Sequence, residues 1–76
     1  MIDLIRLKKG KVAKVVEIEG GSSCQQRLNN LGIRQGVLIS KISASETRGP
    51  IIVKAGHTQI ALGRGMASKI IVEEPS

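Results

Sequence analysis

The segment GGSSCQQRLNNLGIRQG, from Gly20 to Gly36, most constrains the fold, because it predicts one short helix bounded by glycine turns. Ser23 followed by Gln26 fits a capping box, which would satisfy two backbone N–H groups at the helix start. Gly32 stands where a helix ends in a left-handed residue, and Ile33 would then fold back onto the last turn. The pattern predicts a helix over about residues 23–31.

One face of this expected helix is apolar. Cys24, Leu28 and Leu31 recur at helical spacing and form a single stripe. A helix of about two turns does not persist alone in water, so the stripe must be docked on other elements. We expect it to cover the open end of a small β structure.

The remainder of the chain alternates in the manner of short strands separated by turn signals. The expected strands are Val12 to Ile18, Val37 to Ser43, Ile51 to Ala55, Thr58 to Leu62 and Ile70 to Glu73. Between them we expect a loop at Ser45 to Pro50, a tight turn at Gly56-His57 and a helical turn near residues 64–68. This spacing predicts a mainly β fold, a small antiparallel barrel of about five strands, as a single domain over residues 1–76.

The first expected strand contains an irregularity. Its alternation slips between Val15 and Val16. A bulge or sharp bend explains the slip, since small barrels use such bends to turn corners. A strand buried on both faces explains it equally well.

Composition restricts the class of protein. The chain has 76 residues, 41% of them hydrophobic and none aromatic, so its core must be aliphatic. A single cysteine excludes an intramolecular disulfide. No apolar run approaches the roughly 18 residues of a membrane span, and the start of the chain does not resemble a signal peptide. We therefore expect a cytoplasmic protein.

Candidate catalytic and metal-binding groups do not converge. Glu17 with Glu19, and Glu73 with Glu74, fit solvated edges better than acid–base pairs. His57, the one histidine, falls in an expected turn. A metal site needs three or four ligands, so the sequence leaves room only for weak or intermolecular divalent metal binding. We predict no enzymatic activity, no catalytic residue, no cofactor and no resident metal.

Cys24 supports two interpretations. In the first turn of the helix, the helix dipole would favour a reactive thiolate. Its position on the apolar stripe favours a small core residue instead, and we expect the core role.

Basic residues outnumber acidic ones by twelve to six, giving a formal charge of +6. Such a charge favours nucleic acid, anionic lipid or an acidic protein surface as partner. The most suggestive cations are Lys8, Lys9, Lys11 and Lys14 around Gly10, with Arg27 and Arg34 flanking the expected helix. A solvated face that blocks edge-to-edge strand pairing explains them as well.

The order of glycines and apolar residues resembles the FeoA family of bacterial and archaeal ferrous iron uptake. In the first half the resemblance rests on Leu7, Gly10, Ala13, Val15, Ile18, Gly20-Gly21, Arg27-Leu28, Leu31-Gly32-Ile33 and Gly36. In the second half it rests on Gly49-Pro50, Val53, Gly56, Ile60-Ala61-Leu62, Ala67 and Ile70-Ile71-Val72. RLNNLGIRQG is its most specific element. Gln35 departs from the family, which often has Pro there.

The resemblance implies an SH3-like barrel with inserted helical segments and a non-enzymatic, cytosolic accessory role. The implied partner is the FeoB-type ferrous iron permease, whose cytosolic GTPase domain the small protein would bind or regulate. We expect the six basic residues named above to form the partner-binding surface, and no nucleic acid to bind.

Other interpretations stay open. KKGKVAKVVEIEGG is similar to the strand–turn motif of ribosome-associated SH3-like domains that bind nucleic acid, but those domains lack RLNNLGIRQG. Sequence-tolerant binding of single strands usually adds aromatic stacking platforms, and this chain has none. The small number of metal ligands argues against a metallochaperone for Fe²⁺. Exposed strand edges on a small barrel also allow a homo-oligomer.

Overall fold

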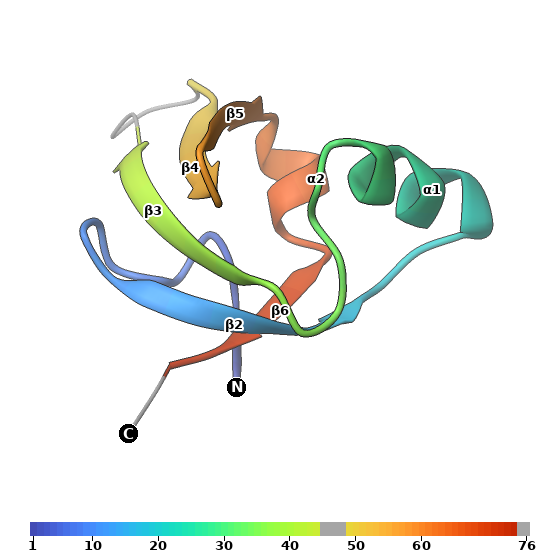
Figure 1. Cartoon of the computed structure of the whole chain (residues 1–76), viewed down its shortest axis with the longest axis horizontal. Coiled ribbons are helices and arrows are strands. Elements are labelled where there is room, and N and C mark those ends of the chain that lie inside the picture. Colours follow the sequence, from blue (N-terminus) through green and yellow to red (C-terminus); the bar gives the residue numbers. More distant parts are fainter. Residues whose placement is uncertain (45–48, 75–76) are drawn as a thin grey trace.

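Six antiparallel strands form one curled sheet in this computed structural model, which describes residues 1–44 and 49–74 (Figure 1). In chain order the elements are β1 Ile2–Asp3, β2 Val12–Ile18, α1 Ser22–Asn30, β3 Leu38–Ala44, β4 Ile51–Ala55, β5 Thr58–Leu62, α2 Arg64–Ala67 and β6 Ile70–Glu73. The sheet order is β1-β6-β2-β3-β4-β5. The mainly β, antiparallel prediction is confirmed. Most of the loop expected at 45–50 lies outside the described residues.

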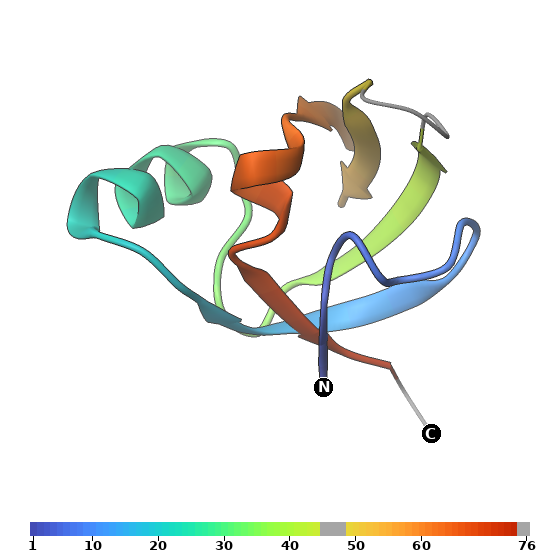
Figure 2. The same cartoon turned by 180° about the vertical axis from the view of Figure 1, so that it is seen from behind.

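The sequence predicted five of the six strands, and the one that it did not predict is β1. It consists of two residues, which pair with β6 through Ile2 opposite Val72 and Asp3 opposite Ile71. Figure 2 shows this N-terminal segment running beside β6. Two residues carry no alternation signal, so only the tertiary pairing reveals this strand.

Strand β2 is irregular where the alternation slips. Its pairing with β6 passes from Val15 opposite Val72 to Glu17 opposite Ile71, which leaves Val16 as the extra residue of a bulge. Val15 is fully buried and Val16 only partly so. The bulge interpretation is therefore confirmed, and the strand buried on both faces is wrong.

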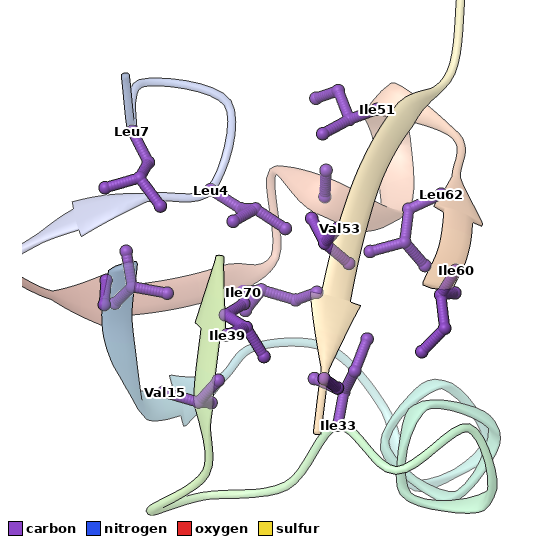
Figure 3. Close-up of a cluster of buried hydrophobic side chains, with 14 of the residues drawn as sticks. Leu4, Leu7, Val15, Ile33, Ile39, Ile51, Val53, Ile60, Leu62 and Ile70 are labelled. Atoms are coloured by element: carbon purple, nitrogen blue, oxygen red, sulfur yellow. The ribbon is translucent and has the colours of Figure 1, made fainter. Parts of the chain in front are cut away.

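The core is aliphatic and lies on the inner face of the curled sheet. Figure 3 shows side chains from several strands converging there, among them Val15, Ile39, Val53 and Ile70. Leu4 and Leu7 join this cluster from the N-terminal segment, and the described residues of the core include no aromatic side chain.

Helix α1 ends as the sequence predicts. Gly32 has a φ of +93°. Its N–H donates to the carbonyl of Asn29 at 3.0 Å, and the N–H of Ile33 donates to the carbonyl of Leu28 at 2.9 Å. These two bonds are those of a Schellman motif. They fold Ile33 back into the core, where it is fully buried.

The prediction for the N-terminal cap of the helix is wrong. The residue that caps α1 is Gly21, with no side-chain cap hydrogen bond, so Ser23 and Gln26 form no capping box. Instead Gln25 ties the helix to the preceding strand, because its Nε2 donates to the carbonyls of Ile18 and Gly20 at 3.2 and 3.3 Å.

The apolar stripe is also shorter than expected. Leu28 is fully buried and Cys24 packs partly against the core, but Leu31 is 41% exposed. As the last residue before Gly32, Leu31 turns away from the core because the Schellman turn brings Ile33 there instead.

The shorter connections follow the sequence prediction. Ala55 pairs with Thr58 across a two-residue turn, Gly56-His57, in which Gly56 has a φ of +63°. That conformation favours glycine and fits the two-residue hairpins of antiparallel sheets. The helical turn expected near residues 64–68 is α2.

We predict that Gly32→Ala lowers the free energy of unfolding by about 1 kcal/mol, because the left-handed backbone disfavours a Cβ atom. An added Cβ meets no atom within 4 Å at this position, so the cost comes from the backbone alone. Urea unfolding monitored by circular dichroism measures the change.

The matched control is Gly65→Ala within α2, where an added Cβ also meets nothing within 4 Å and φ is not positive. Alanine favours helix over glycine, so this variant should be neutral or up to about 1 kcal/mol more stable. Equal destabilisation of the two variants would contradict the account of Gly32.

Candidate functional site

The six basic residues expected to bind a partner are all exposed, but they do not form one cluster. Lys8, Lys9 and Lys11 form a basic turn before β2, while Arg27 lies on α1 and Arg34 shortly after it. In Figure 1 this turn and α1 lie at opposite ends of β2. Seven strand residues span about 20 Å, and Lys14 lies between the two groups.

These cations are unpaired within the described part of the chain. None of the six side chains makes a hydrogen bond or ion pair with a residue in 1–44 or 49–74. The ion pair found in these ranges joins Arg6 and Asp3, at 4.0 Å. The six charges are therefore available to an acidic partner.

The conformation of the basic turn depends on a residue that sequence reasoning missed, Lys41 of β3. Its side chain is only 5% exposed, and its Nζ donates to the carbonyls of Ile5 and Leu7 at 2.7 Å each. Its own carbonyl accepts the N–H of Gly10 at 2.7 Å, and its N–H donates to the carbonyl of Lys11 at 3.1 Å. One residue thus holds both ends of the turn.

Strand alternation places Lys41 inside the sheet, and this burial changes its pKa. It occupies an inward position, two residues after the buried Ile39, so strand alternation was the signal that could have revealed it. Burial lowers the pKa of Lys41 below the usual lysine value of 10.5, and the Arg64 guanidinium lowers this pKa further. The Asp3 carboxylate partly opposes both effects.

Two adjoining recesses open beside β2, one toward α1 and the other toward the turn after α1. One has a volume of about 450 Å³ and is lined by Glu17, Ile18, Gln25, Asn29, Arg34 and Gln35. The other, about 480 Å³, is lined by Lys14, Val15, Val16, Gln35 and Gly36. Gln35 belongs to both, and its Nε2 donates to the carbonyl of the bulge residue Val16 at 2.8 Å. Lys14 and Arg34 therefore lie on two adjoining recesses that share Gln35 beside the bulge.

Arg27 lies apart, at a third recess of about 280 Å³ between α1 and α2. This recess is also lined by Ser23, Cys24, Met66 and Lys69. The thiol of Cys24 donates to the thioether sulfur of Met66 at 3.4 Å, and both side chains pack against the core. The geometry gives Cys24 the packing contacts expected of a small core residue.

Groups of metal ligands are not found in residues 1–44 and 49–74, where no three His, Cys, Asp or Glu side chains lie close enough to hold an ion. His57 is exposed at the β4–β5 turn. A search of the same ranges for a helix long and apolar enough to span a bilayer also finds none.

Comparison with known proteins gives a consistent match. The model of the FeoA domain family matches residues 2–74. A protein of Methanocaldococcus jannaschii named "Putative Fe(2+) transport protein A" is 36% identical over 74 residues, which cover 97% of this chain and 88% of that protein.

Solved structures agree with this match. The crystal structure of an iron uptake regulatory protein, FeoA, has a TM-score of 0.90 at 31% identity over 97% of both chains. A zinc complex of FeoA from Stenotrophomonas maltophilia, described as an SH3 domain protein, has a TM-score of 0.81 at 22% identity. It covers 96% of this chain and 91% of that one. The SH3-like fold expected from the sequence is confirmed.

We predict that Lys41→Met lowers the free energy of unfolding by about 1–3 kcal/mol, because the carbonyls of Ile5 and Leu7 lose their donor. Lys54→Met is the matched control, since Lys54 lies exposed on the neighbouring strand β4. Its effect should stay within about 0.5 kcal/mol. Urea titration compares the two, and equal stabilities would refute the role assigned to Lys41.

The pH dependence provides a second readout. Since the folded protein holds the Lys41 proton less tightly than the unfolded chain does, the unfolded chain binds more protons just below pH 10.5. The stability that Lys41 contributes should therefore rise with pH in that window. The gap in unfolding free energy between the wild type and Lys41→Met should widen there, whereas a narrowing gap would contradict the lowered pKa.

Proposed function

Since the chain belongs to the FeoA family, we propose that it is a non-enzymatic, cytoplasmic accessory of ferrous iron uptake. Its proposed partner is the cytosolic GTPase domain of a FeoB-type ferrous iron permease, bound through protein–protein contacts. The observation that carries this proposal is the match of the family's model to residues 2–74. The relative named for Fe(2+) transport, 36% identical, supports the same process.

The proposed contact surface consists of the exposed cations Lys8, Lys9, Lys11, Lys14, Arg27 and Arg34. Their charges are unpaired within the described residues, and the chain carries a formal charge of +6. Such a surface would attract an acidic face of the GTPase domain and speed the encounter. Lys41 holds both ends of the basic turn. The backbone that carries Lys8, Lys9 and Lys11 therefore needs little further ordering when a partner binds.

We predict that the triple variant Lys8→Glu, Lys9→Glu and Lys11→Glu weakens binding to the GTPase domain by about tenfold or more, since each charge reversal at a rim costs a few tenths of a kcal/mol to about 1 kcal/mol. Isothermal titration calorimetry at physiological salt measures the dissociation constant. Raising the salt concentration should weaken binding of the wild type more than binding of the variant, because the variant has fewer charge pairs that salt can screen.

The matched control compares Lys9→Gln with His57→Glu. Both lower the formal charge by one at an exposed side chain, but His57 lies at the β4–β5 turn, outside the six cations of the proposed contact surface. Only Lys9→Gln should weaken binding. Equal effects would indicate unspecific charge attraction, and salt-dependent RNA binding in place of GTPase-domain binding would favour a nucleic-acid partner.

A further inference from the structure

The outer face of the sheet carries an apolar pair that the core does not use. Val12 on β2 is 45% exposed and Leu38 on β3 is 58% exposed. Their sequence neighbours Ala13 and Ile39 are buried, so the two exposed side chains point outward. Both strands lie inside the sheet order rather than at an edge.

The strand register brings these two side chains together. Val12 lies opposite Ser40, and Lys14 lies opposite Leu38. Val12 and Leu38 are therefore diagonal neighbours on one face of the sheet, at a separation of about 7–8 Å. We call this exposed pair the apolar spot.

Cations border this spot on the same face. Lys14 is the direct cross-strand neighbour of Leu38. Ser40 of β3 lies opposite Val12 of β2 on one side and opposite Lys54 of β4 on the other. Val12, Ser40 and Lys54 therefore form one row across three strands. Both lysines are exposed. We call Val12, Lys14, Leu38 and Lys54 the outer-face patch.

The surface continues past Lys14. The recess of about 480 Å³ begins at Lys14 and shares Gln35 with the recess that contains Arg34. An extended or helical segment lying across the patch would meet apolar surface at the centre and a cation at either side. A third cation, Arg34, would lie beyond the bulge.

We infer that the outer-face patch docks an acidic, amphipathic protein segment of the GTPase-bearing permease. The apolar side of that segment packs on Val12 and Leu38, and its carboxylates pair with Lys14 and Lys54. The choice of occupant follows from charge complementarity, because an apolar centre between two lysines matches apolar residues flanked by acids. This inference rests on the proposed function for the identity of the partner.

An anionic membrane fits the same face less well. Glu73 of β6 lies directly opposite Lys14, and Glu17 lines the adjoining recess with Arg34. A continuous layer of lipid phosphates would meet these carboxylates as well as the lysines. The carboxylates of a protein segment can lie beside the lysines and away from Glu73 and Glu17, which avoids that repulsion.

The test uses the double variant Val12→Thr and Leu38→Thr against the isolated GTPase domain, by calorimetry at physiological salt. Threonine suits a strand, and both side chains are exposed, so the fold should be retained, which circular dichroism and thermal unfolding check. We expect the dissociation constant to rise about tenfold or more, because two apolar contacts are lost. Leu31→Thr, at an exposed leucine of the α1 end, should leave it unchanged.

The charge part of the inference has its own matched pair. Lys54→Gln should weaken binding about threefold and reduce its salt dependence, whereas His57→Glu, which lowers the formal charge equally at the exposed β4–β5 turn, should do neither. Lys54 lies outside the six cations of the proposed contact surface, so its effect reports on the patch alone.

The outcomes separate this inference from the proposed function. If the wild type binds the GTPase domain and the basic-turn variant loses affinity while the threonine variant does not, the function stands and the patch is refuted. If the wild type does not bind the domain at all, both are refuted. Sedimentation with vesicles of phosphatidylglycerol and phosphatidylcholine that depends on Leu38, without binding to the domain, would overturn the inference in favour of a membrane surface.

Discussion

Strand β2 joins the two parts of the sheet, β1-β6 and β3-β4-β5, because it is paired along both of its edges. This strand pairs with β3 on one side and with β6 on the other, and the bulge at Val16 shifts its register against β6. Next to the bulge, the turn after α1 closes onto β2, since the N–H of Gly36 donates to the carbonyl of Val15 at 2.7 Å. The same strand therefore contributes Ala13 and Val15 to the core on its inner face, and Val12 and Lys14 to the outer-face patch.

A further constraint is the small aliphatic core. A domain of 76 residues buries only about 60% of its unfolded surface, and without aromatic side chains each aliphatic contact carries more of the stability. A buried lysine is costly in such a core unless its donors are satisfied. Lys41 meets that condition by binding the carbonyls of Ile5 and Leu7, which closes the N-terminal segment over the core and shapes the basic turn. Lys41 therefore both stabilises the fold and holds the turn that carries Lys8, Lys9 and Lys11.

The sequence pattern predicted those features that depend on residues close together in the chain. Alternation located five strands and the bulge at Val16, and the spacing of Gly32 predicted the left-handed helix end. Two of the features that the sequence did not predict depend on contacts between segments distant in sequence. Strand β1 exists only through its pairing with β6, and the inward lysine Lys41 is explained only by the carbonyls it meets. The capping box failed because Gly21 caps the helix and Gln25 binds back to β2 instead. Exposure of the basic residues was predictable, but their division between two ends of β2 required the fold.

The most direct test of the central claim, that the protein contacts its partner through β2 and the strands beside it, is an amide titration. The ¹⁵N-labelled protein is titrated at physiological salt with the GTPase domain of the permease from the same host. We expect saturating shifts on the basic turn, on β2 around Val12 and Lys14, and on β3 around Leu38. Saturating shifts confined to the recess of Cys24 and Met66, or no shifts, would contradict this claim.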